Sequence, residues 1–138
     1  MKTLDDVKLI QLKTFLEPDG SLVPIESDKD VPFLIERVFY VYGVEDQNNR
    51  GKHAHYDTEQ ILICLIGRIE VTCKDECSSA TWILDSPNKA LYVPNMIWDE
   101  QKYCTSNSVL LVLASTRYDI EDYIEIWDEF IEEKKREK

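Results

Sequence analysis

Short runs of apolar residues, each closed by a polar turn, recur along most of this chain. The run 60–66 is almost continuously apolar, and beyond Gly67 the residues Ile69, Val71 and Cys73 alternate with polar ones. Together they predict a buried hairpin, because alternation places every second side chain on one face of a strand. Further strands are expected around the two histidines and at residues 7–15, 22–26, 37–44, 82–84, 90–93 and 109–114. Many short strands separated by turns predict an all-β sandwich or barrel.

The period of the pattern changes after Asp119. Apolar residues recur at helical spacing over residues 120–131, while acidic residues fill most other positions. This predicts a C-terminal amphipathic α-helix packed on the barrel, with Asp119 as its N-cap. Trp127 and Phe130 are expected in core or dimer contacts rather than in a ligand site.

Length and charge narrow the class of protein. The 138 residues match one ordinary domain, so residues 1–138 are expected to form a single unit. The formal net charge of −11 argues against general affinity for nucleic acid or an anionic membrane. No apolar segment resembles a signal peptide or a bilayer span, which makes the cytoplasm the expected location. The four cysteines show no CxxC pair and are expected as reduced thiols.

The chain has only two histidines, and both lie in one short segment. In a strand, His53 and His55 would project from the same face, with Ala54 turned away. Histidine both accepts and returns protons near neutral pH. Arg50 and Lys52 lie just before them, so the segment combines proton transfer with a local positive charge in an acidic chain.

The histidine segment resembles the first motif of the cupin superfamily, with Glu59 and then Gly67 at the expected distances. In many cupins this motif supplies metal ligands. Asp99 stands where the resemblance implies a further histidine, and a carboxylate can ligate Mn, Fe or Zn. A metal site of His53, His55, Glu59 and Asp99 therefore stays open as an alternative.

A closer resemblance, to the nucleotide-sugar 3,4-ketoisomerases, covers nearly the whole chain. The segments that carry it are 20–26, 31–33, 37–40, 50–55, 84–87 and 112–115. It implies a small cupin-type jelly roll, usually a homodimer, acting on dTDP-4-keto-6-deoxyglucose with no metal or other cofactor. It also implies a product that is a precursor of 3-amino-3,6-dideoxy sugars in surface glycans or antibiotics.

The proposed reaction moves a carbonyl between adjacent carbons through an enediol, so it needs a group that removes one proton and a group that returns one. The resemblance gives both histidines catalytic importance. We expect His55 to be the base that takes the proton from carbon 3, and His53 to relay protons or to hydrogen-bond the developing oxyanion.

Five further residues are candidates for substrate binding. Arg50 is the first choice for the diphosphate, provided that Gly51 interrupts the strand alternation. Arg37 begins a neighbouring strand and reaches the same pocket or forms a surface ion pair. Tyr40 stacks on the thymine ring, hydrogen-bonds the sugar or packs in the core.

The remaining two candidates follow Trp98, where family members tend to have Trp-His-Glu. Asp99 replaces that histidine, which leaves the galacto or gluco configuration at carbon 4 of the product open. Glu100 orients a catalytic group or is an exposed carboxylate.

Three other functions remain open from the sequence. The Arg-Gly-x-His element is also similar to that of dTDP-sugar 3,5-epimerases. A metal-dependent cupin oxygenase and a cupin that binds a sugar nucleotide without chemistry are the other two. A homodimer is expected in each case, because the unpaired backbone groups of an exposed edge strand can pair with a second copy. Exchange of N-terminal strands is one way to form it.

Overall fold

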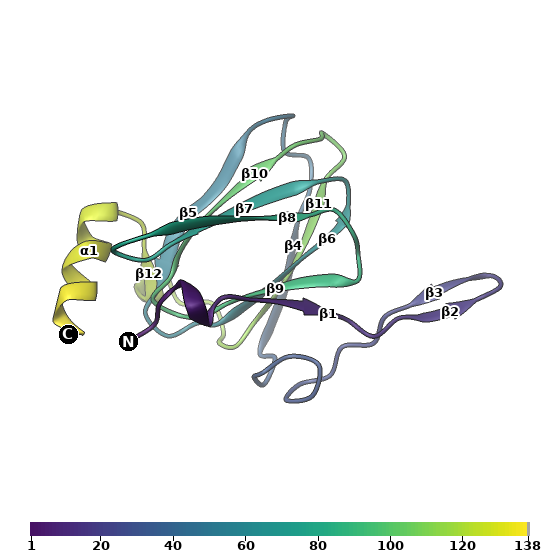
Figure 1. Ribbon diagram of the computed structural model, residues 1–138, viewed down its shortest axis with the longest axis horizontal. Coiled ribbons are helices and arrows are strands. Elements are labelled where there is room, and N and C mark those ends of the chain that lie inside the picture. The colour runs from purple at the N-terminus through teal and green to yellow at the C-terminus, as the bar shows by residue number, and fades with distance from the viewer. Residues whose placement is uncertain (138) are drawn as a thin grey trace.

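Two five-stranded sheets face each other across the core in the computed structural model, which describes residues 1–137 (Figure 1). The first sheet has the order β1 (Lys8–Gln11), β9 (Lys89–Val93), β6 (Gln60–Ile66), β11 (Val109–Ala114) and β4 (Arg37–Val41). The second has the order β12 (Tyr123–Ile124), β5 (Asn49–His55), β10 (Trp98–Tyr103), β7 (Ile69–Lys74) and β8 (Ser79–Leu84). All neighbouring strands in both sheets run antiparallel.

Strand β6 is apolar along most of its length because both of its faces are covered. Leu62 and Cys64 point into the core between the sheets. Ile61 and Ile63 lie on the outer face, where Phe33 and neighbouring residues of the 23–35 segment pack over them. A strand buried on both faces loses the polar alternation that a half-exposed strand shows.

The predicted hairpin between residues 60–66 and 69–74 is wrong. Gly67 does turn the chain, but β6 and β7 belong to opposite sheets and do not pair. Instead, β7 pairs with β10 and β8. A Cβ on Gly67 would lie 2.5 Å from the Ser108 hydroxyl oxygen and 2.6 Å from that of Thr105, at a φ of +88°. The corner between the two sheets therefore requires glycine at this position.

The C-terminal helix is present but begins later than its pattern predicts. Helix α1 spans Trp127–Arg136, whereas Ile120–Asp122 form a 3₁₀ turn (η2) and Tyr123–Ile124 form β12. Asp119 does accept a hydrogen bond at a helix start, but it caps η2. The helix packs on the outer face of the second sheet, where Phe130 is fully buried against Trp98 and Ile124. Trp127 meets the edge of Trp98, so the two aromatic residues make packing contacts as expected.

The N-terminal region departs from the two sheets. After a 3₁₀ turn at Leu4–Asp6 (η1) and strand β1, the chain forms a hairpin of β2 (Phe15–Glu17) and β3 (Gly20–Leu22) that projects away from the sheets (Figure 1). The strand expected over residues 7–15 is thus split in two.

Strand β10 was missed, because its inward residues include Asp99 and Gln101. All four cysteines are free thiols. No helix within residues 1–137 has the length and apolar character needed to cross a bilayer.

Candidate active site

A bulge in β5 brings Arg50 and His53 to the same side of the strand. On the neighbouring strand β10, Asp99 pairs with His53 and Glu100 pairs with Gly51, so Lys52 has no partner of its own. Gly51 and Lys52 both have positive φ values, of 90° and 48°. One extra residue reverses the alternation of a strand. The interruption on which the assignment of Arg50 depended is therefore present.

Arg50 and His53 border a cavity of about 300 Å³ between the two sheets. Apolar side chains of β4 and β11 form one wall, and the other side chains are polar apart from Gly51. The residues that line it are Phe39, Val41, Arg50, Gly51, His53, Gln60, Gln101, Leu110, Val112, Tyr123 and Glu125. An apolar wall opposite convergent polar groups is typical of a small-molecule site.

His53 has a defined protonation pattern. Its Nδ1 atom lies 2.7 Å from the carbonyl oxygen of Gly51, which can only accept a hydrogen bond. Nδ1 therefore carries the proton in the neutral ring, and Nε2 carries the lone pair. The result is a partly buried histidine at the cavity wall with a free basic nitrogen.

His55 lies behind His53 and is only 4% exposed. The two imidazole rings meet edge to face, with centroids 4.9 Å apart. Burial, followed by the nearby His53, lowers the pKa of His55 to about 4, so its ring is neutral at pH 7. Its Nδ1 atom lies 3.1 Å from Asp122 Oδ2, and its buried Nε2 atom has no hydrogen-bond partner.

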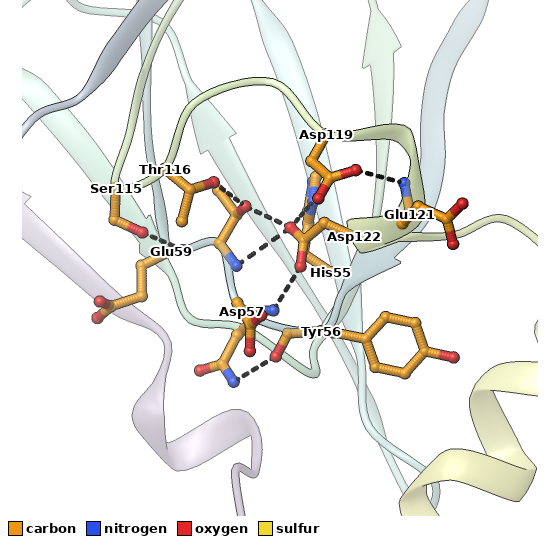
Figure 2. Close-up of polar contacts among 11 residues, drawn as sticks. His55, Tyr56, Asp57, Glu59, Ser115, Thr116, Asp119, Glu121 and Asp122 are labelled. Carbon is orange, nitrogen blue, oxygen red and sulfur yellow. Dashed lines mark hydrogen bonds and ion pairs between the residues drawn. The ribbon is translucent and has the colours of Figure 1, made fainter.

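Asp122 is a site residue that the sequence pattern did not predict. It comes from η2, and Figure 2 shows its carboxylate beside His55 at the centre of a hydrogen-bond network. The amide and hydroxyl of Thr58 and the amide of Asp57 donate to it. Burial acts to raise the pKa of the Asp122 carboxyl, but the bonds from Thr58 and Asp57 and the nearby His55 outweigh burial and lower this pKa. Asp122 is thus an anion at neutral pH.

Tyr123 adds an aromatic hydroxyl group to the same site. Strand β12 pairs with β5, which sets Tyr123 opposite His55. The centroid of its ring lies 4.4 Å from that of His55 and 5.3 Å from that of His53. Tyr123 also borders the cavity. Sequence periodicity placed it in a helix, which concealed this role.

The two predicted substrate residues on β10 point to opposite faces. Asp99 is buried on the inward face, and its Oδ1 atom has no hydrogen-bond partner. Burial raises the pKa of Asp99 to about 6, against the opposing effect of His53. Glu100 lies on the outward face and forms an ion pair of 3.2 Å with Lys74. Asp99 therefore lies next to His53 but does not line the cavity, and Glu100 lies on the opposite face of the strand.

Strand β4 likewise separates Arg37 from Tyr40. Arg37 is partly buried, with its guanidinium over the rings of Phe39 and Tyr118 and its Nε atom buried without a partner. Phe39 lines the cavity, so Arg37 lies beside a residue of the cavity wall but is not itself a lining residue. Tyr40 is 65% exposed on the outer face, where it stacks on Tyr42. Tyr40 therefore does not reach the cavity of its own chain.

The four residues considered for a metal site do not come together. The carboxylate of Glu59 accepts a hydrogen bond from the Tyr92 hydroxyl on the outer side of the first sheet, away from the histidines. Within residues 1–137, the one group of three potential ligands close enough to share an ion is Asp75, Glu76 and Cys77, at the turn between β7 and β8. His53, His55, Glu59 and Asp99 therefore do not form the cluster of ligands that the metal-site alternative requires.

Comparison with known proteins identifies the family. The family model described as "FdtA: WxcM-like, C-terminal" matches residues 5–135. The chain belongs to this family. It is 42% identical over 123 residues to a TDP-4-oxo-6-deoxy-α-D-glucose-3,4-oxoisomerase of Aneurinibacillus thermoaerophilus, covering 89% of this chain and 88% of that protein. The resemblance noted from the sequence is confirmed.

Solved structures agree with this family. The sugar 3,4-ketoisomerase QdtA of Thermoanaerobacterium thermosaccharolyticum, in complex with TDP, superposes with a TM-score of 0.93 at 39% identity, over 97% of this chain and 98% of that one. A histidine-to-asparagine variant of QdtA bound to TDP-4-keto-6-deoxyglucose gives a TM-score of 0.91 at 38% identity, over 95% of each chain. The predicted jelly roll is confirmed by these matches.

Proposed function

We propose that this protein is a 3,4-ketoisomerase that moves the keto group of dTDP-4-keto-6-deoxy-D-glucose from carbon 4 to carbon 3. The observation that carries the proposal is the cavity with His53 at its wall and His55 directly behind it, in a chain of the ketoisomerase family. The substrate follows from the relatives, one of which is named for TDP-4-oxo-6-deoxyglucose and another of which was solved with the equivalent keto sugar.

The reaction removes two protons and returns two. A base takes the proton from carbon 3, the C–H electrons form the C3–C4 double bond, and the carbonyl oxygen at carbon 4 receives a proton. The resulting enediol then loses the proton of its oxygen at carbon 3, whose electrons form the new carbonyl, and carbon 4 receives a proton. No redox partner is needed, because the electrons stay within the sugar.

The geometry favours His53 as the base that reaches carbon 3, since His53 borders the cavity and its Nε2 carries the lone pair of the neutral ring. His55 is buried behind it, which suits a group that exchanges protons with the site rather than one that contacts carbon 3 directly. This division is the reverse of the one expected from the sequence. Tyr123 lies beside both rings, and its hydroxyl can donate a hydrogen bond to a developing oxyanion.

Charge in the cavity supports an anionic substrate. Arg50 lines the same cavity as His53, so its guanidinium can bind the diphosphate while the sugar lies against the histidine. Arg37 has a buried Nε without a partner and lies beside the cavity residue Phe39, so we assign it as the second cation available to the substrate. Asp99 adds a buried acid next to His53, close to where carbon 4 is reprotonated, and we assign it an influence on the configuration of the product.

A homodimer is part of the proposal. Phe15, Leu16 and Leu22 expose apolar side chains on the projecting hairpin. Strand β4 is an open edge of the first sheet and carries exposed Val38 and Tyr40. An unpaired edge and a detached apolar hairpin complement each other between two copies of one chain. Exchange would thus involve β2 and β3, since β1 already pairs with β9 of its own chain. The cytoplasmic location stays a prediction from the sequence.

Proton NMR in deuterated water tests the function. Purified protein is mixed with freshly prepared dTDP-4-keto-6-deoxyglucose, and the signals of carbons 3, 4 and 5 are followed. We expect loss of the carbon 3 proton and growth of a 3-keto product, whose coupling constants give the configuration at carbon 4. Exchange at carbon 5 with the keto group still at carbon 4 would instead identify a 3,5-epimerase. An unchanged spectrum together with TDP binding would identify a non-catalytic binding protein.

A further inference from the structure

We propose that Asp122 is a positioning residue that holds His55 in the tautomer with its proton on Nδ1, and that Thr58 and Thr116 fix Asp122 for this task. The effect on turnover rests on the proposed function. The effect on the tautomer can be measured without turnover.

The carboxylate of Asp122 has little freedom to rotate, because both of its oxygens are engaged. Oδ1 accepts a hydrogen bond of 2.7 Å from the Asp57 amide. Oδ2 lies 3.1 Å from His55 Nδ1 and 3.3 Å from the Thr58 amide nitrogen, and it also accepts from the Thr58 hydroxyl. A carboxylate surrounded by donors can only accept, so His55 must donate from Nδ1.

Thr116 completes the network from the other side (Figure 2). The hydroxyl groups of Thr58 and Thr116 are hydrogen-bonded to each other. Because Thr58 gives its single hydroxyl proton to Asp122, the Thr116 hydroxyl must donate to Thr58. The direction of every bond in the chain from Thr116 through Thr58 to Asp122 is therefore determined by the anion at its end.

The chemical consequence lies on the other nitrogen of His55. With Nδ1 protonated, the lone pair of the neutral ring is on Nε2, which is buried and has no partner. A proton taken up there creates an imidazolium 3.1 Å from the Asp122 carboxylate, which stabilises it. The proton on Nδ1 does not leave, and Asp122 stays ionised. His53 and Arg37, the other charged or titratable groups that act on His55, both oppose the positive charge, so Asp122 is its main support.

The chain suits a direct spectroscopic test, since it contains only two histidines. In protein labelled with ¹⁵N-histidine, the imidazole nitrogen shifts report the tautomer, and His53→Asn assigns the remaining signals to His55. We expect the Nδ1–H tautomer in the unmodified protein. Asp122→Leu removes every acceptor oxygen at nearly unchanged size. It should move His55 towards the Nε2–H form and lower kcat by about 10²-fold, with TDP affinity changed by less than about 3-fold.

A second substitution separates tautomer from charge. In Asp122→Asn, the amide oxygen should keep the Oδ2 place, where three donors converge, so the Nδ1–H tautomer is retained. Loss of the negative charge should lower kcat by about 10-fold. Asp119→Asn is the matched control, because Asp119 lies in the same loop but its side chain bonds only to the Glu121 amide. It should leave both the tautomer and kcat unchanged.

Two results would overturn the proposal. One is a His55 that keeps the Nδ1–H tautomer in Asp122→Leu, and the other is a kcat within about 3-fold of the unmodified enzyme once the tautomer has changed. If Asp122→Leu does not fold, Thr58→Val tests the same series of hydrogen bonds. Thr58→Val should give a mixture of His55 tautomers, and Thr58→Ser should restore the single Nδ1–H tautomer. An unaltered tautomer in Thr58→Val would then count against the proposal. If the unmodified protein shows the expected tautomer but no turnover, the proposed function fails while the positioning role stands.

Discussion

His53 and His55 lie on one face of β5 with ring centroids 4.9 Å apart, yet only His53 borders the cavity. The two rings are therefore not equivalent. His53 has its Nδ1 anchored on a backbone carbonyl and is partly buried, whereas His55 has its Nδ1 on a carboxylate and is buried. Their different surroundings predict different effects when each is replaced.

We expect His53→Asn to lower the rate of proton exchange at carbon 3 by about 10³-fold or more, because the proposed base for this proton is lost. His55→Asn should lower turnover by about 10- to 100-fold and keep measurable exchange at carbon 3. Exchange is followed by NMR in deuterated water, with TDP affinity as the control for an intact site. Retained exchange in His53→Asn with complete loss in His55→Asn would instead identify His55 as the base, as expected from the sequence.

The bulge at Gly51 provides a second prediction. A Cβ at this position would lie 3.1 Å from Asp99 Oδ1 and 3.3 Å from Gln101 Nε2, at a φ of +90°. Gly51→Ala should therefore destabilise the fold by about 1–3 kcal/mol. It should also lower kcat about 10-fold, because the Gly51 carbonyl that anchors His53 is displaced.

Gly43→Ala is the control for Gly51→Ala. Gly43 also has a positive φ, of +74°, but a Cβ there would meet nothing within 4 Å. Its substitution should cost about 1 kcal/mol in unfolding free energy and leave kcat unchanged. Urea unfolding and steady-state turnover measure the two effects. Equal kcat values for the two alanine variants would show that the bulge does not position His53.

The proposed dimer interface predicts that a charge introduced on the hairpin of β2 and β3 separates the two subunits. Leu16 is 82% exposed on the projecting hairpin, and Leu16→Glu places a charge where apolar contact with a second copy is proposed. Light scattering should then give a monomer at concentrations where the unmodified protein is a dimer. Ile83→Glu, on the edge strand β8 of the other sheet, is the control and should leave the dimer intact. A dimer that persists in Leu16→Glu would exclude the hairpin from the interface.

Much of the fold could be predicted because inward and outward residues alternate along a strand, and the sequence shows this alternation. The alternation of Ile69, Val71 and Cys73 correctly gives the inward face of β7. It does not reveal which strand lies beside β7, since strands that pair within one sheet and strands that face each other across two sheets bury the same residues. The hairpin wrongly expected between β6 and β7 follows from this ambiguity.

The site was only partly visible for a similar reason. The adjacent histidines and Arg50 are local in sequence, and Gly51 signals the bulge that aligns them. Asp122 is 67 residues away from the histidine that it contacts, so no local spacing marks it. Tyr123 lies among apolar residues spaced as in a helix, although the chain there forms a short strand. Long-range strand pairing decides such positions, and one sequence does not encode it in any short pattern.

Two buried groups with opposite pKa shifts give a prediction for stability against pH. The pKa of His55 falls from 6.5 to about 4 on folding, mainly through burial, so the unfolded chain binds more protons between these values. Acid then favours unfolding in this window. The pKa of Asp99 rises from 3.8 to about 6, also mainly through burial, so the folded chain binds more protons there and acid favours folding. Each shift corresponds to about 3 kcal/mol, and the two nearly cancel.

Replacing one of the two groups should make the effect of the other on the pH dependence of stability measurable. Between about pH 6 and 4, Asp99→Asn should lose up to about 3 kcal/mol of unfolding free energy relative to the unmodified protein as the pH falls. Relative to the unmodified protein, His55→Asn should gain up to about the same amount between pH 6.5 and 4. Urea unfolding at a series of pH values measures both, and the comparison with the unmodified protein removes the contribution of the many surface carboxylates. Parallel pH curves for all three proteins would mean that neither group titrates away from its ordinary range, because the opposite slopes depend on both being buried.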